Sequence, residues 1–264
     1  MRNFARLLVG SLLPWAASHA LYNGNPAFPM MPESGFFIGK NACFSLKAGY
    51  EWDDVFNRKL QIKGHPEHVH RKVPTSELLG NFGVLTIGVA DRVELYTTLG
   101  SLSSDFHQRA RPATTVKFKT NDQWAWSIGG RVILAYWGDL QLGVDAKYFC
   151  YSPEVDHLHV NGSTVHGSEA GFHYREWQVG AGVSYRSTWF CPYAGVKYSN
   201  VRSKFYHLNA IQAIYPHKHF TLENKYPMGF FVGLGVCLKK GIDLNAEARF
   251  FDETAVTLSS DFRF

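Results

Sequence analysis

The sequence predicts an all-β protein: an antiparallel transmembrane β-barrel of about ten strands, with long extracellular loops and short periplasmic turns. Three observations predict this fold. Apolar residues alternate with polar residues or glycine along successive segments, as from Leu140 to Tyr148 and from Met228 to Leu238. The connections between these segments alternate between short and long, and aromatic residues gather at both ends of the segments. A soluble sandwich also alternates, but long loops at one end and two aromatic bands are typical of a membrane barrel.

The first segment, residues 1–20, has the features of a secretory signal peptide. Arg2 and Arg6 precede a short apolar run over residues 7–13, and small residues lead to Ala20. The run is too short to span a bilayer as a helix. We therefore expect cleavage after Ala20 and export of the remaining chain.

Residues 21–42 follow as an irregular arm, because Pro26, Pro29 and Pro32 interrupt any regular element. Two positions for this arm stay open, the barrel lumen and the periplasm. Residues 43–264 then form the barrel.

The strands of the barrel are predicted from the alternating segments. They are expected at about 43–58, 78–89, 92–100, 121–136, 140–152, 171–186, 189–202, 226–238, 242–251 and 255–264. Short turns fall near 90–92, 137–139, 186–188 and 239–241, and long polar segments near 59–77, 101–120, 153–170 and 203–225. The chain stops inside its last strand, and Phe262 and Phe264 on one face are predicted to close the barrel.

The polar face of the predicted strands would point into the lumen. The candidate pore-lining residues on this face are Lys47, Glu94, Arg131, Gln141, Asp145, Lys147, Glu176, Gln178, Lys197, Asp243, Glu247 and Arg249. Both signs of charge occur, and glycines on the same face would leave room. Ten strands lie near the size at which side chains fill a barrel, so a narrow passage and a closed lumen both stay open.

Four cysteines lie in the exported part, and none forms a CxxC pair that would indicate zinc. Cys191 and Cys237 share the lumen-facing phase on neighbouring strands and are candidates for a disulfide. The alternative is free buried thiols. Cys150 lies near the long-loop rim, where it could pair with another molecule.

Other function classes have weak support. Loss of Arg2 and Arg6 lowers the net charge from +5 to +3, which does not indicate a nucleic-acid partner. Histidines in the long segments fit solvated loops better than a metal site, and no cofactor is expected. A barrel hydrolase is a rival that would use Asp and His near the rim, such as Asp53 and His157, but no GxSxG motif is present. We therefore do not expect an enzyme.

Three stretches resemble the chlamydial major outer membrane protein family. They are the start Asn25-Pro26-Ala27-Phe28-Pro29, the segment from Ala48 to Leu60, and the end from Ala246 through Thr254 to Asp261-Phe262-Arg263-Phe264. Together they cover about a fifth of the exported chain, at both ends and in the family's order. This chain looks like a short, divergent member, with fewer strands and fewer cysteines than the archetype.

The resemblance implies a porin in a bacterial outer membrane that passes small hydrophilic solutes or ions and contributes to the cell envelope. It also implies outer-membrane lipid and the barrel assembly machinery as partners, and envelope proteins joined through disulfides. A homo-oligomer is a further candidate. The short length keeps two alternatives open: a non-conducting structural or adhesive barrel, and an outer-membrane barrel hydrolase.

Overall fold

The structure is a computed structural model. It describes residues 22, 24–30, 35–36, 43–63, 73–165, 169–187, 189–238 and 241–264. Residues 1–20, where the signal peptide is predicted, lie outside this part.

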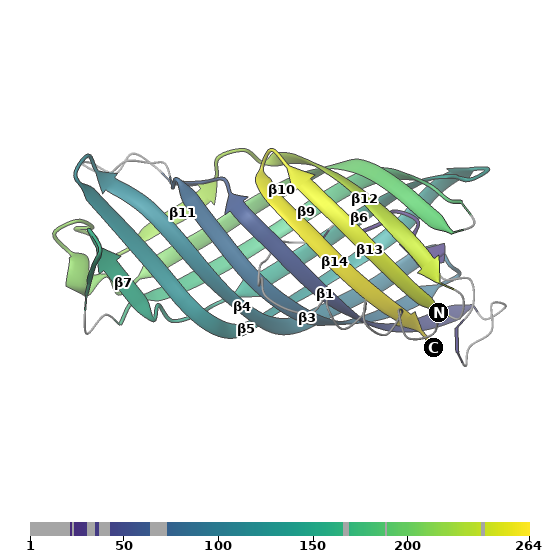
Figure 1. Ribbon diagram of the computed structural model, residues 1–264, viewed down its shortest axis with the longest axis horizontal. Coiled ribbons are helices and arrows are strands. Elements are labelled where there is room, and N and C mark those ends of the chain that lie inside the picture. The colour runs from purple at the N-terminus through teal and green to yellow at the C-terminus, as the bar shows by residue number, and fades with distance from the viewer. Residues whose placement is uncertain are drawn as a thin grey trace, which may run out of the picture.

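An antiparallel sheet closes on itself to form the barrel (Figure 1). Within the described chain the barrel strands are β1 (Phe44–Arg58), β3 (Thr75–Val89), β4 (Val93–Arg111), β5 (Thr114–Trp137), β6 (Leu140–Tyr151), β9 (Gly171–Tyr185), β10 (Phe190–Tyr206), β12 (Met228–Leu238), β13 (Ile242–Phe250) and β14 (Glu253–Arg263). Each strand pairs with the next along the chain, and β14 pairs with β1. The predicted ten-stranded barrel is therefore confirmed.

The two faces of the strands are inverted relative to a soluble protein. On β4, Leu95 is 65% exposed on the outside, whereas its neighbour Glu94 is fully buried inside. The same contrast recurs on β9, where Trp177 is exposed and Gln178 is buried. Such a band of outward apolar side chains is what a lipid bilayer requires.

At the short-turn end, β14 closes onto β1 as the sequence predicts. Phe262 lies opposite Ala48, and the backbone N–H of Phe264 donates to the carbonyl of Leu46 at 2.8 Å. The β3–β4 turn places Ala90 and Asp91 at φ 54° and 50°. Two successive positive φ angles form the turn whose twist suits a tight hairpin.

The strands extend past the predicted boundaries at the long-loop end. The expected strands 92–100 and 121–136 are too short, because β4 and β5 continue as a hairpin through much of the segment predicted as a loop. The outward residues there become polar, such as Asp105 and His107, while the inward residues become apolar, such as Leu102 and Phe106. The hydrophobic phase thus reverses where the strand leaves the bilayer, and a search for lipid-facing alternation ends too early.

Short elements complete this end of the barrel, on the left in Figure 1. They are η2 (Asn209–Ile211), β2 (Leu60–Ile62), β7 (His157–Val160), β8 (Ser163–Thr164) and β11 (Phe220–Asn224). β11 joins β10 to β2, and β7 pairs with β5. We call these elements and the β4–β5 hairpin beyond residue 101 the outer extension.

Among the described residues, no helix is long and apolar enough to cross a membrane.

Candidate functional site

The lumen is the candidate site, because most of the buried charge lies there. All twelve of the predicted lumen residues are buried, the most exposed being Arg131 at 7%. The structure brings them together with residues that the alternation pattern does not single out. Three features fill the lumen: a charge layer, the N-terminal arm on its short-turn side, and an apolar core on its long-loop side.

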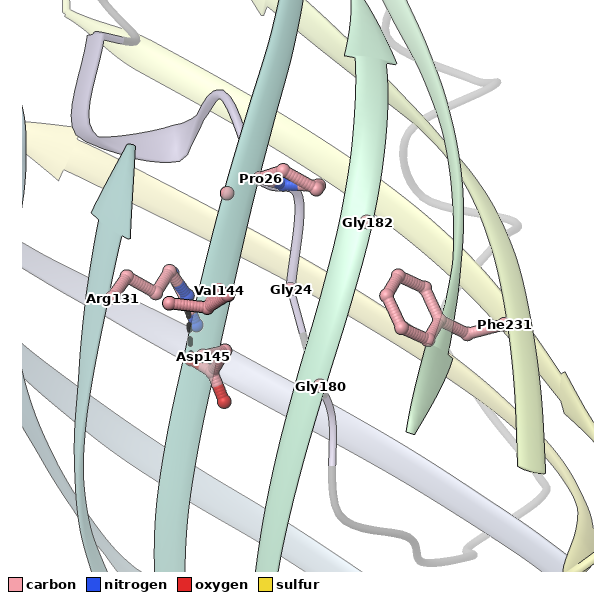
Figure 2. A pocket seen from close by; sticks show the side chains of 9 residues that line it. Gly24, Pro26, Arg131, Val144, Asp145, Gly180, Gly182 and Phe231 are labelled. Carbon is pink, nitrogen blue, oxygen red and sulfur yellow. Dashed lines mark hydrogen bonds and ion pairs between the residues drawn. The ribbon is translucent and has the colours of Figure 1, made fainter. Parts of the chain in front are cut away.

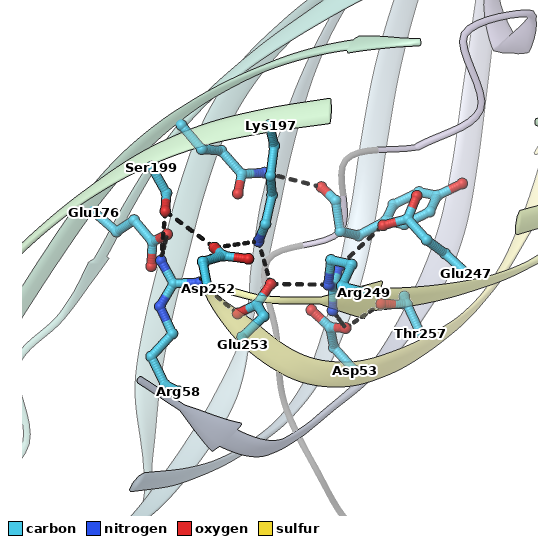
Figure 3. Close-up of polar contacts among 12 residues, drawn as sticks. Asp53, Arg58, Glu176, Lys197, Ser199, Glu247, Arg249, Asp252, Glu253 and Thr257 are labelled. Carbon is cyan, nitrogen blue, oxygen red and sulfur yellow. Dashed lines mark hydrogen bonds and ion pairs between the residues drawn. The ribbon is translucent and has the colours of Figure 1, made fainter. Parts of the chain in front are cut away.

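Arg58 stands at the centre of the charge layer. Its guanidinium lies 2.5 Å from Glu176, 2.8 Å from Asp252 and 2.6 Å from Glu253 (Figure 3). It also donates to Ser199 at 2.8 Å. One buried cation therefore joins three strands and the β13–β14 turn across the lumen.

Lys197 and Arg249 complete the charge layer. Lys197 pairs with Asp252 at 3.1 Å and also contacts Glu253. Arg249 contacts Asp53 at 2.6 Å, Glu247 at 3.2 Å and Glu253 at 3.0 Å. The layer thus consists of Asp53, Arg58, Glu176, Lys197, Glu247, Arg249, Asp252 and Glu253, with cations and carboxylates interleaved.

The predicted lumen residues do not include four members of this layer: Arg58, Asp53, Asp252 and Glu253. The pairing of β1 with β14 shifts register between Val55 and Asn57. Such a bulge moves later residues to the other face, and it turns Arg58 inward. Asp252 and Glu253 lie in and after a tight hairpin, where alternation gives no signal. Asp53 is on the inward phase, but its place near the outer rim led us to interpret it as a possible hydrolase residue.

A second set of ion pairs lies nearer the short turns. Lys47 is 2.7 Å from Glu94, and Arg131 is 3.0 Å from Asp145. Tyr96 donates its hydroxyl to the same Asp145 at 2.8 Å. Between the two sets, Lys147 pairs with Glu51 at 3.3 Å. Predicted lumen charges are thus bound to one another rather than to open solvent.

The described arm residues enter the lumen beside these pairs. The ammonium of Lys47 donates to the carbonyl of Phe28 at 2.7 Å, and the backbone N–H of Gly24 donates to Glu247 at 3.2 Å. The guanidinium of Arg131 lies 5.6 Å from the ring centre of Tyr22 and 4.8 Å from that of Phe28. Cation–π contacts of this kind gain strength when water is excluded. Of the two open positions for the arm, the structure shows the lumen for residues 22 and 24–30, whereas Phe36 is exposed.

Glycines make room for the arm. A Cβ on Gly143 would lie 2.9 Å from the carbonyl oxygen of Pro26, and one on Gly182 would lie 2.9 Å from the Pro26 ring (Figure 2). The cavity left around Pro26 measures about 10 Å³, which is close to the minimum for one water molecule. Its walls are Gly24, Pro26, Arg131, Gly143, Val144, Asp145, Gly180, Gly182 and Phe231. The space that lumen-facing glycines leave inside the barrel is therefore occupied by the arm around Pro26.

An apolar core fills the outer end of the lumen. Phe205 is at its centre, with ring centres 4.4 Å from Phe118, 4.4 Å from Phe172 and 4.9 Å from Phe220. Each of these rings is buried. The core is contiguous with buried Leu, Ile, Val and Tyr side chains of the outer extension. Sequence reasoning missed it because it assumed a polar lumen along the whole barrel.

The candidate disulfide between Cys191 and Cys237 is absent from the structure. The two side chains pack near each other against Ala27. Cys191 stands opposite Gly235, so Cys237 is its diagonal neighbour two residues along β12. Diagonal partners lie roughly 7–8 Å apart, beyond the usual Cα separation for a disulfide of about 4.4–6.8 Å.

The candidate rim residues of a hydrolase have other partners. Asp53 accepts hydrogen bonds from Arg249 and Thr257 inside the charge layer. Asp156 accepts the backbone N–H of Asn121, and His157 is exposed on β7. The structure does not bring these groups into one cluster. Among the described residues, no set of three His, Cys, Asp or Glu side chains is placed to hold a metal ion.

Comparison with known proteins shows which family this chain resembles. The profile of the Chlamydia major outer membrane protein matches residues 160–221. A major outer membrane porin of Chlamydia trachomatis, serovar H, is 26% identical over 74% of this chain and 73% of its own length. The Chlamydia muridarum porin is 24% identical over 69% of each chain. The chain is related to the chlamydial major outer membrane porins. It is accordingly a porin-like β-barrel of the bacterial outer membrane.

The alignment also shows a difference between this chain and the serovar H porin. The alignment with the serovar H porin runs over 291 positions, more than the 264 residues of this chain. The porin therefore carries segments that this chain lacks.

Two solved outer-membrane proteins have low similarity to this chain. An outer membrane channel from Pseudomonas putida F1 covers 96% of this chain and 100% of its own, at 10% identity and a TM-score of 0.43. The outer membrane protease OmpT from Escherichia coli covers 84% of this chain and 95% of its own, at 12% identity and a TM-score of 0.38.

Proposed function

We propose that this porin-like barrel is closed, and that it serves the envelope as a non-conducting structural barrel that holds the outer extension at the cell surface. The observation that carries the proposal is the double filling of the lumen. A charge layer and arm occupy the membrane-embedded part, and an apolar core occupies the outer end. Either filling alone would obstruct ions.

The charge layer is a poor route for an ion. Removing one partner of a buried pair costs about 3–5 kcal/mol, because a charge is left uncompensated. A passing ion would have to separate Arg58 from Glu253 or Lys197 from Asp252, and then enter a core of phenylalanine rings.

Passage of small hydrophilic solutes is the second candidate, and the names of the relatives favour it. For this function the arm would have to leave the lumen. The apolar core would also have to open, since it lies in series with the arm along the barrel axis. We rank it second for that reason.

Solute flux into liposomes separates the two candidates. The exported chain would be refolded into vesicles and compared with a variant lacking residues 21–42, using glycine and a small sugar as solutes. The closed-barrel proposal expects no swelling above empty vesicles from either protein. Swelling with the shortened variant alone would favour an arm-gated porin, and swelling with both would overturn the proposal.

A further inference from the structure

Two arginines face outward, opposite each other, on neighbouring strands. Arg175 on β9 is the direct antiparallel partner of Arg202 on β10. Both side chains are exposed, and no ion pair joins either of them to a carboxylate of the described residues. Like charges directly opposite on one face of a sheet destabilise it. An anion bound between the two would turn this repulsion into attraction.

The next row outward adds positive charge. His173 is the partner of Lys204, which is exposed. Together with the arginine pair these residues form what we call the basic patch: His173, Arg175, Arg202 and Lys204. Two acidic residues lie near it. Glu223 on β11 faces Arg202 in the register, is half-buried, and accepts a hydrogen bond from Gln61 at 3.2 Å. Glu154 is exposed and pairs with Gly171, two residues from His173.

The patch lies at the edge of the lipid-facing surface. On the outward face of β9, the next residue toward the membrane after Arg175 is Trp177. On the outward face of β10, Asn200 and then Tyr198 follow Arg202 toward the membrane. The Trp177 and Tyr198 rings are 5.3 Å apart, and aromatic rings of this kind mark the membrane interface. Two residues of strand span about 7 Å, which places the arginines level with lipid headgroups.

We propose that the basic patch binds the phosphate groups of an anionic lipid in the outer leaflet. A guanidinium presents paired N–H donors that match phosphate oxygens, and two such groups side by side suit a phosphorylated headgroup. The hydrocarbon chains of the same lipid would lie against Trp177, Val179 and Tyr198 below. This inference depends on the outer-membrane location and is independent of whether the lumen is closed.

Binding of bisphosphorylated lipid A to the refolded protein tests the proposal. The protein would be held in zwitterionic detergent micelles, with a fluorescent lipid A as the probe. A basic side chain near an anionic surface contributes about 1 kcal/mol, so R175Q/R202Q should bind about thirtyfold more weakly. The matched control K119Q/K218Q removes two exposed charges, one from β5 in the outer extension and one from the loop between η2 and β11, and should bind within about twofold of the unchanged protein.

Further arms separate the sources of the anion. Dephosphorylated lipid A should bind the unchanged protein as weakly as R175Q/R202Q binds the phosphorylated probe. Equal binding by both double variants would overturn the proposal, and so would full competition by millimolar inorganic phosphate. Displacement of the lipid by a sulfated polysaccharide at lower concentration would assign the patch to a polysaccharide instead. Circular dichroism and heat-modifiable gel migration would check that each variant is folded.

Discussion

Arg58 and Glu253 lie 2.6 Å apart inside the barrel, although 195 residues separate them along the chain. The pair joins the first barrel strand to the start of the last, next to the seam where β1 meets β14. It is therefore part of the closure of the barrel as well as of the filling of its lumen.

Arg58→Leu should destabilise the barrel strongly. The change leaves Glu176, Asp252 and Glu253 without their shared cation, and a broken buried pair costs about 3–5 kcal/mol. Urea unfolding in lipid vesicles, followed by tryptophan fluorescence, measures the loss. The control is Glu77→Gln, at an exposed position on β3, which should change stability by less than about 0.5 kcal/mol. Equal effects of the two substitutions would contradict the assigned role of Arg58.

Gly143→Val should expel the arm while leaving the barrel folded. The Cβ would meet Pro26 at 2.9 Å, and the three atoms nearest to it all belong to Pro26. Protease cleavage between residues 21 and 42 should become faster, as read by mass spectrometry. Gly83→Ala is the control, because its Cβ would have nothing nearer than 3.8 Å. An arm as protected in the valine variant as in the parent would argue against its place in the lumen.

Phe205→Ala should weaken the outer extension. The ring contacts Phe118, Phe172 and Phe220, and truncation of a buried phenylalanine costs about 3–5 kcal/mol. Hydrogen exchange should rise in β11, in the β4–β5 hairpin and in the part of β10 that pairs with β11, while the membrane-embedded parts of the strands stay protected. If exchange is unchanged there, the apolar core does not hold the extension together.

None of the four cysteines should be found in a disulfide. Cys43 is exposed and Cys191 is buried, so a maleimide should label Cys43 quickly and Cys191 only after unfolding. Mild oxidation with copper phenanthroline should not link Cys191 to Cys237, because they are diagonal rather than facing partners. A linked peptide pair in the digest of the oxidised protein would contradict this register.

The sequence predicts the barrel itself well, because lipid-facing positions such as Leu140, Val144 and Tyr148 must alternate with inward ones. The twelve predicted lumen residues are placed on the inward face for the same reason. Alternation cannot show what fills the space between the strands. Lys47 and Glu94 occupy the inward phase whether they line water or bind each other, and only their 2.7 Å separation in the folded chain distinguishes the two cases.

Two local features of the chain also escape the pattern. The bulge after Val55 turns Arg58 inward without any change in composition. Beyond Ser101 the outward residues become polar and the inward ones apolar, so the same strand looks like a loop once it leaves the bilayer. Both failures occur where pairing geometry, rather than the local run of residues, determines which face a side chain takes.

Planar-bilayer recording of the refolded, unmodified protein tests the central claim most directly. A barrel whose lumen holds the Arg58 charge layer, the arm and the Phe205 core should insert without producing steady conductance steps in concentrated potassium chloride. Reproducible steps whose ion selectivity shifts in the Lys147→Glu variant, but not in Val144→Ala on the lipid-facing phase, would show an open, charge-lined lumen and contradict the closed barrel.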